Sequence, residues 1–469
     1  MYTRIQENIG GQHMELQEAV RGYQEQLLKS LQESIRIRSV QGEASETYPY
    51  GKGVQDCLEH ALKTAAALGF QTTDLDHQMG WCEYGEGEEM VAVLGHLDVV
   101  PEGDGWSFDP FGGEIRDGKV FGRGAMDDKG PTMAALYALA ALKDSGLPIR
   151  RRIRLLFGTN EETGSNDMKY YRSHGGEIPV MGFTPDGEYP VINGEKGLIN
   201  VKFSRDYTQD GEVQILEIHG GSAPNVVPAE ATAKIACPDD LATRLLEKSD
   251  EKIQYKKTEN GILLTATGRS AHGATPELGI NAIGLLLEAL CELPLSEETK
   301  RWTSFLKDRI GLETRGTSLG IELADEISGN LSLNLGTLKG DASSVALEIN
   351  YRYPVTKSYE DCAPILEQAF TEAGFQKTGE RHKKSLYVPE ESELIQTLLG
   401  VYQDLTGLEA VPKSIGGGTY AKAIPNIVAF GPIFPGDEVR EHKPDEFIEV
   451  EKLMKNAEIL AEAMYRLAK

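Results

Sequence analysis

The sequence has few cysteines and little basic charge. Its five cysteines are Cys57, Cys82, Cys237, Cys291 and Cys362. They are widely spaced and form no C-x-x-C pair, so neither a disulfide framework nor a zinc ribbon is expected. Lys and Arg number 48 against 73 Asp and Glu, which gives a net charge of −25. No uninterrupted run of Lys and Arg is longer than Arg150-Arg151-Arg152. Because nucleic-acid binding needs a basic surface, we expect no nucleic-acid partner.

Long apolar runs are also missing. The longest mostly apolar stretch covers residues 133–142, about half of the roughly 20 residues that a membrane-spanning helix needs. The first twenty residues contain no apolar segment of the kind found in signal peptides. Together with the unpaired cysteines, these absences predict a cytoplasmic protein without a membrane partner. The residues before Met14 match no pattern that we can interpret.

Both ends of the chain alternate amphipathic helices with apolar strands. Apolar residues at spacings of three and four predict helices over residues 15–37 and 54–68. Pro131 suits the first turn of another helix, over residues 132–142. The apolar runs 90–94 and 153–157 predict buried strands. The pattern indicates an α/β domain with a mostly parallel sheet flanked by helices.

The pattern changes in the middle of the chain. Short alternating strands interleaved with helices run from residue 196 to residue 383, where a polar stretch ends the segment. We interpret this segment as an inserted α+β domain of two small subunits. The expected domain limits are therefore 1–195 and 384–469 for the α/β domain and 196–383 for the insertion.

Acidic and histidine side chains gather in the loops that follow the predicted strands. Each has an ordinary structural explanation when taken alone: a hydrogen-bonded pair, acids at a helix N-terminus, or solvated charge. In open α/β sheets, however, sites form at the carboxyl ends of the strands. The residues in question are His96, Asp98, Asp127, Asp128, Glu161, Glu162, Asp186 and His442.

The motifs that contain these residues resemble one family. In chain order they are G-H-x-D, W-x-x-D-P-F, G-R-G-x-x-D-D-K-G, N-E-E-x-G, P-D-G and a late histidine followed by D-E. The set is similar to the dinuclear-zinc aminoacylase, carboxypeptidase G and succinyl-diaminopimelate desuccinylase metallopeptidases. The long insertion and the stretches P-V-I-N-G-E-K-G and G-G-G-T-Y most resemble the PepV-type dipeptidase branch.

The resemblance implies a catalytic domain that holds two Zn²⁺ ions per chain. His96 and Asp186 would bind one ion, Glu162 and His442 the other, and Asp127 would bridge them. Because the site is rich in carboxylates, Mn²⁺ or Co²⁺ could substitute. Two further roles follow from motif position. Glu161 would be the general base, and Asp98 would orient the ring of His96 from behind.

The insertion is implied to be a lid that binds substrate. His272 matches a lid histidine that donates to the developing oxyanion. Asn225 and Arg352 resemble groups that grip the substrate, and the guanidinium can bind a C-terminal carboxylate in a bidentate way. The loop residues Gly417, Gly418 and Thr419 could present backbone N–H groups to an anion. The alternatives are a structural histidine, an arginine paired with an acid, and a merely flexible loop.

The resemblance implies a zinc dipeptidase that hydrolyses small peptides with free amino and carboxyl ends. An N-acyl-amino-acid deacylase or desuccinylase of the same family is the alternative, because the same chemistry cleaves either amide. An inactive binding protein on this fold is a third possibility. It would lack a metal ligand or the general base, and none of these residues is missing from the motifs.

The length of the insertion also bears on assembly. Many relatives have a shorter lid that forms a dimer, so that the lid histidine acts on the other subunit. Here the second half of the lid is expected to replace the dimer partner. His272 would then act within its own chain, and the enzyme would be a monomer.

Overall fold

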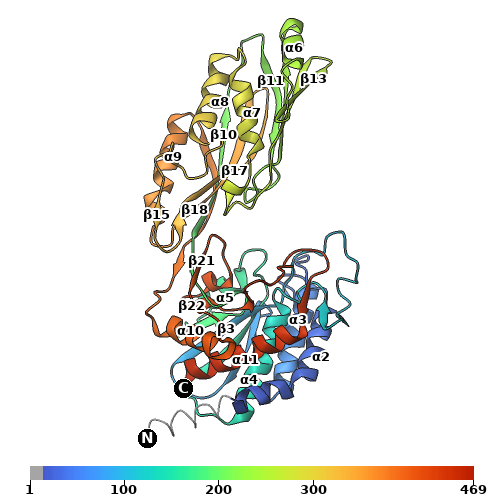
Figure 1. Cartoon of the computed structure of the whole chain (residues 1–469), viewed down its shortest axis with the longest axis vertical. Coiled ribbons are helices and arrows are strands. Elements are labelled where there is room, and N and C mark those ends of the chain that lie inside the picture. The colour runs from blue at the N-terminus through green and yellow to red at the C-terminus, as the bar shows by residue number, and fades with distance from the viewer. Residues whose placement is uncertain (1–13) are drawn as a thin grey trace. The chain divides into compact units, whose positions relative to one another are not determined.

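The structure is a computed structural model that describes residues 14–469, and the chain folds into two compact units (Figure 1). The first unit contains the chain up to Asn193 together with Val388–Lys413 and Gly418–Lys469. The second contains Gly194–Tyr387 and Ser414–Gly417. The chain therefore passes between the units four times.

The first unit is built on a sheet whose central strands are parallel. Its order begins β1-β2-β6-β3-β7-β22. These strands are β1 (Gln71–Leu75), β2 (Met79–Tyr84), β3 (Met90–His96), β6 (Arg152–Gly158), β7 (Met181–Thr184) and β22 (Ile427–Ala429). Strand β3 runs parallel to β6 and β7, and β22 runs parallel to β7. Every residue of β3 is buried, as expected of a parallel strand covered on both faces.

The helices of this unit pack against the sheet or against one another. They are α2 (Gln24–Ile35), α3 (Lys52–Ala67), α4 (Lys129–Ser145), α5 (Asn166–Ser173), α10 (Glu393–Thr406) and α11 (Val450–Ala468). Helix α4 is buried throughout residues 129–142 because it contacts both β3 and α11. It ends at Gly146, whose φ of 63° is a left-handed conformation that glycine adopts without strain. The predicted helix over residues 15–37 is two helical segments, interrupted at Tyr23.

Short elements complete the first unit. They are β4 (Glu114–Arg116), β5 (Lys119–Phe121), β8 (Gly187–Glu188), β23 (Pro432–Ile433), β24 (Phe447–Glu449) and η3 (Tyr420–Ala423). Strands β9 (Ile192–Glu195), β20 (Leu386–Tyr387) and β21 (Lys413–Ile415) lie where the chain passes between the units. The α/β fold class predicted from the sequence is confirmed.

The second unit is one antiparallel sheet of eight strands in the order β13-β14-β12-β11-β17-β18-β10-β19. The strands are β10 (Gly197–Asp206), β11 (Gln214–Gly220), β12 (Glu230–Ala236), β13 (Ile253–Thr258), β14 (Gly261–Thr267), β17 (Ser332–Asp341), β18 (Ser344–Tyr353) and β19 (Gln376–Lys383). Buried and accessible residues alternate along β10, because one face of the sheet packs against helices.

The helices of this unit share a single core with the sheet. They are α6 (Asp239–Leu246), α7 (Ala282–Cys291), α8 (Glu297–Arg309), α9 (Ala363–Glu372), η1 (Pro276–Leu278) and η2 (Tyr359–Asp361), and β15 (Ala324–Asp325) pairs with β16 (Gly329–Asn330). The two predicted subunits are the two four-stranded halves of the sheet. Pairing of β11 with β17 joins them edge to edge. They are not consecutive in the chain, because β10 comes first in sequence but belongs to the second half.

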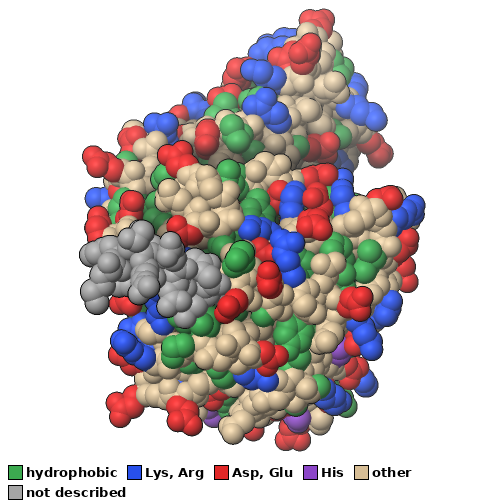
Figure 2. All heavy atoms as spheres, turned by 60° about the horizontal axis from the view of Figure 1, so that its bottom comes forward, with side chains coloured by type: hydrophobic (Ala, Val, Ile, Leu, Met, Phe, Trp, Pro, Cys, Tyr) green, Lys and Arg blue, Asp and Glu red, His purple; other side chains and the backbone are tan. Residues whose placement is uncertain are grey.

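Charged side chains of both signs lie on the face of the molecule drawn in Figure 2, where they are interspersed. Arg152 is one of the paired cations, with Glu83 at 2.8 Å and Glu177 at 2.6 Å. Within residues 14–469, no helix combines the length and apolar composition needed to cross a bilayer.

Candidate metal centre

The predicted ligands meet at one edge of the central sheet of the first unit. His96 is the last residue of β3, Asp127 lies just before α4, and Glu162 follows β6. Asp186 follows β7, and His442 lies in the loop before β24. Parallel strands place their carboxyl ends on the same edge, which is where α/β sheets build their sites.

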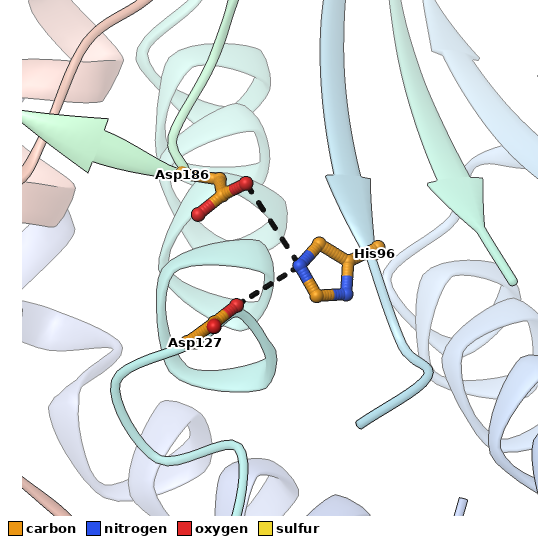
Figure 3. Close-up of side chains that lie close together, drawn as sticks. All are labelled: His96, Asp127 and Asp186. Carbon is orange, nitrogen blue, oxygen red and sulfur yellow. Dashed lines mark ion pairs between the residues drawn. The ribbon is translucent and has the colours of Figure 1, made fainter. Parts of the chain in front are cut away.

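His96, Asp127 and Asp186 form the first ligand set, and Figure 3 shows the three side chains pointing toward one another. Nε2 of His96 lies 3.0 Å from Oδ1 of Asp127 and 3.9 Å from Oδ2 of Asp186. His96 is fully buried, and among residues 14–469 no group lies in hydrogen-bond geometry to its Nε2. A buried nitrogen aimed at two carboxylates without a hydrogen bond is suited to a metal ion.

Asp127, Glu162 and His442 form the second set. Nε2 of His442 lies 2.9 Å from Oδ2 of Asp127 and 3.2 Å from Oε1 of Glu162. Asp127 therefore offers one oxygen to each set. In each set, the candidate ligand atoms all lie within 4.8 Å of one another. A shared carboxylate between two such sets is the geometry of a two-metal site.

The electrostatics of the centre favour added positive charge. Hydrogen bonds to Asp127 and Glu162 raise the pKa of His442 to about 11. Burial raises the pKa of Glu161 to about 7, and the neighbouring carboxylates add to this shift. Burial also holds the pKa of Asp186 well above its usual range. The acids here outnumber the bases, and carboxylate and imidazole ligands together suit Zn²⁺, Mn²⁺ or Co²⁺.

The ring of His96 is oriented by backbone and helix contacts. Its Nδ1 lies 2.9 Å from the backbone oxygen of Asp98 and 3.5 Å from the carboxylate of that residue. Asp98 therefore faces this nitrogen with both its backbone oxygen and its carboxylate, and the backbone oxygen is the nearer of the two. With Nδ1 donating, Nε2 keeps a free lone pair. The preceding Gly95 has no space for a side chain, because a Cβ there would lie 2.0 Å from Oγ1 of Thr132 on α4.

The carboxylate of Asp98 has a different partner. It accepts the backbone N–H groups of Glu161 and Glu162, each at 3.1 Å. Asp98 thus links the His96 strand to the loop that carries the candidate base. Asp128 makes a similar contact, because its Oδ2 accepts the backbone N–H of His96 at 3.0 Å.

Glu446 is a residue of this centre to which the motifs gave no role. It is fully buried, and its Oε1 accepts the backbone N–H groups of Met126 at 2.8 Å and Asp127 at 3.1 Å. Its Oε2 accepts from Arg123 at 2.7 Å. The D-E pair after His442 was the only sequence signal for it.

Three of the predicted substrate-binding residues, Arg352, His272 and Asn225, lie in the second unit. Arg352, on β18, is buried and donates to Oδ1 of Asn350 at 3.2 Å and to the backbone oxygen of Gly416 at 2.6 Å. Burial lowers its pKa to about 10. Across residues 14–469 no carboxylate forms an ion pair with it, so the acid-paired alternative finds no support.

His272 and Asn225 lie on adjacent loops of this unit. The backbone oxygen of Asn225 accepts the N–H of Gly273 at 2.7 Å. Burial, and then the charge of Arg352, lower the pKa of His272.

The predicted anion-binding loop is divided between the units. Gly417 belongs to the second unit, whereas Gly418 and Thr419 belong to the first. The hydroxyl of Thr419 accepts the N–H of Ala421 at the start of η3.

Most of the chain matches the model of one known protein family. The model of peptidase family M20/M25/M40 matches residues 92–466. The chain belongs to this family. It is therefore a metallopeptidase, as its motifs implied, and the two groups of candidate ligands that share Asp127 could hold metal ions.

Relatives of this M20 peptidase share its full length. "Putative dipeptidase YtjP" of Bacillus subtilis (strain 168) is 39% identical over 457 residues, which cover 95% of this chain and 98% of the relative. Among solved structures, Dug1p of Saccharomyces cerevisiae, described as a di-peptidase, has a TM-score of 0.58 at 13% identity, covering 97% of this chain and 98% of that chain. The YXEP protein of Bacillus subtilis, described as a dinuclear metal binding peptidase, has a TM-score of 0.51 at 10% identity, covering 96% and 99%. At these identities the solved structures show a shared fold.

Proposed function

We propose that this M20 peptidase is a dipeptidase that hydrolyses dipeptides with a free amino end and a free carboxyl end. The observation that carries the proposal is the pair of ligand sets that share Asp127, with the Glu161–Glu162 loop held beside them by Asp98. The dipeptidase name of YtjP, at 39% identity, supports this substrate class.

The proposed centre holds two Zn²⁺ ions, for which Mn²⁺ or Co²⁺ could substitute. His96 and Asp186 would hold one ion, Glu162 and His442 the other, and Asp127 both. When bound, such ions polarise a carbonyl group and lower the pKa of water.

Glu161 is proposed as the general base. It lies in the loop whose backbone is bound by Asp98, and it belongs to neither candidate ligand set. It takes a proton from the attacking water as oxygen bonds to the scissile carbonyl carbon. It then delivers that proton to the nitrogen of the leaving amine as the C–N bond breaks.

Arg352 is proposed to bind the free carboxylate of the substrate. A buried guanidinium without an anion is costly, and a substrate carboxylate would supply the missing charge. The loop residues Gly417, Gly418 and Thr419 are proposed to present backbone N–H groups to an anion. His272 is proposed to donate to the developing oxyanion, and Asn225 to contact the substrate.

We also propose that the chain works as a monomer in the cytoplasm. The five unpaired cysteines support a reducing compartment. A second unit that contains both halves of its sheet within one chain supports the monomer.

The test is hydrolysis by metal-stripped protein, with and without added Zn²⁺, Mn²⁺ or Co²⁺, of a dipeptide and its N-acetylated counterpart. We expect metal-dependent cleavage of the free dipeptide alone. Preference for the acetylated compound would assign the chain to the deacylases instead. Absence of cleavage of both compounds by metal-loaded protein would contradict hydrolysis altogether.

A further inference from the structure

Asp167, near the start of α5, binds the backbone of the loop that leads to Glu161 and Glu162. Its side chain is fully buried. The Oδ2 atom accepts the N–H of Thr159 at 2.7 Å and that of Asn160 at 3.1 Å, and Oδ1 accepts the N–H of Met168 at 2.7 Å. The carboxylate thus fixes the two residues directly before the candidate base.

Tyr420, the first residue of η3, makes a second contact with the same group. Its hydroxyl donates to Oδ2 of Asp167. Its ring meets the ring of His96 edge-on, with the ring centres 6.0 Å apart and the planes at 79°. Both residues are fully buried. One side chain therefore contacts a candidate metal ligand and, through Asp167, the loop that carries another.

The ring of Tyr420 also fills the space beside the end of β6. A Cβ atom at Gly158 would lie 2.3 Å from ring and hydroxyl atoms of Tyr420. Gly158 precedes the Thr159–Glu162 loop directly. The absence of a side chain at residue 158 is what allows the ring to reach His96.

We propose that Asp167 and Tyr420 are positioning residues that hold His96 and the Thr159–Glu162 loop in the geometry needed to bind metal. The proposal rests on the proposed function, because that function makes His96 and Glu162 metal ligands. The physical reason is that ligands must be fixed in place by their surroundings for tight metal binding, and partners behind the ligands typically contribute 10- to 100-fold in affinity or activity.

An acid at residue 167 suits this role better than an amide. Four donors surround its two oxygens: three backbone N–H groups and the hydroxyl of Tyr420. An asparagine would turn its NH₂ group toward at least one of these donors. A carboxylate accepts all four.

The test compares Tyr420→Phe with the matched control Tyr189→Phe. Tyr189 is also fully buried in the first unit, and its hydroxyl donates to Oδ1 of Asn456 at 2.6 Å. Both variants lose one buried hydroxyl. We would measure Co²⁺ affinity by equilibrium dialysis of metal-stripped protein, the visible spectrum of the Co²⁺-loaded protein, and thermal stability.

We expect Tyr420→Phe to weaken Co²⁺ binding by roughly 10- to 100-fold and to alter the spectrum. Tyr189→Phe should lower thermal stability comparably while leaving affinity and spectrum unchanged. A Tyr420→Phe protein with wild-type affinity and spectrum would overturn the proposal. Because these measurements need no substrate, they separate the failure of this proposal from failure of the dipeptidase assignment.

A second experiment uses the contact between Gly158 and Tyr420. Gly158→Ala should displace the ring and weaken Co²⁺ binding in the wild-type background. In a Tyr420→Ala background the same substitution should cost little more, because the colliding ring is gone. If Gly158→Ala weakened Co²⁺ binding by the same factor in both backgrounds, a collision with the Tyr420 ring would not be the cause. That result would contradict the proposed positioning role.

Discussion

Buried carboxylates around the metal centre bind backbone N–H groups as well as charged side chains. Asp98 binds the N–H groups of Glu161 and Glu162, Glu446 those of Met126 and Asp127, and Asp167 those of Thr159 and Asn160. Charge-assisted hydrogen bonds of this kind are about twice as strong as neutral ones. Each carboxylate therefore fixes a loop whose side chains take part in the proposed chemistry.

The proposed role of Glu161 predicts a loss of turnover without a loss of metal. Glu161→Gln removes the proton acceptor but leaves both ligand sets intact. We expect kcat to fall by roughly 10²- to 10⁴-fold, while metal content, measured by atomic absorption, stays at the wild-type level. Near-normal kcat would remove Glu161 from the role of general base.

The proposed role of Arg352 predicts a loss specific to free carboxylates. Arg352→Ala should raise KM for a free dipeptide much more than for the same dipeptide with a C-terminal amide. The physical reason is that only the free carboxylate can form the bidentate ion pair. Equal losses on both substrates would show that Arg352 does not bind the carboxylate.

At the scale of helices and strands, apolar pattern decided which elements could be predicted. The buried strands β3 and β6 and helix α4 have mostly apolar sequences, and the sequence predicts all three. Strand β19 is an edge strand whose residues are mostly exposed, and its polar sequence had suggested a domain end. An edge strand can pair through its backbone with little of its surface buried. The sequence of β19 therefore lacks the alternation of apolar and polar residues that would predict a strand.

Packing of α2 against α3 predicts a pH dependence of stability. Nε2 of His60 on α3 lies 3.2 Å from the backbone oxygen of Ser30 on α2, and burial lowers the pKa of His60 below its usual value of 6.5. The unfolded chain therefore binds a proton at His60 more readily than the folded chain does. The free energy of unfolding falls as the pH drops below about 6.5, the usual pKa of histidine.

His60→Gln keeps a donor at this position without the titration. Between pH 7.5 and pH 5.5, we expect the urea midpoint of the wild type to fall more than that of the variant. Circular dichroism in urea at the two pH values would measure this difference. Parallel decreases in the two proteins would mean that His60 contributes nothing to acid sensitivity.

At the scale of the whole molecule, the eight-stranded sheet of the second unit bears on the oligomeric state. The two four-stranded halves of this sheet meet at β11 and β17, which pair with each other within one chain. The outer strands of the sheet carry lysines, at Lys256 and Lys257 in β13 and at Lys377 and Lys383 in β19. Charged edge strands oppose pairing with another chain. These features support a lid that needs no second subunit.

The monomer proposal makes a complementation prediction. Light scattering should give a mass near 51.4 kDa. A mixture of Glu161→Gln and His272→Ala chains should stay as inactive as either variant alone, because each active site would draw both residues from one chain. A stable dimer together with recovered activity in the mixture would show that His272 acts on the partner.

The sequence by itself determined the α/β class and the family, and it predicted the residues of both candidate ligand sets, because these depend on local apolar pattern and on motifs with fixed spacing. It did not reveal Glu446 or Asp167 as loop-fixing acids, the contact of Tyr420 with His96, or the joining of two lid halves into one sheet. Those features depend on which distant segments meet. Tyr420 and Asp167 are 253 residues apart in the chain, and only tertiary packing brings them together.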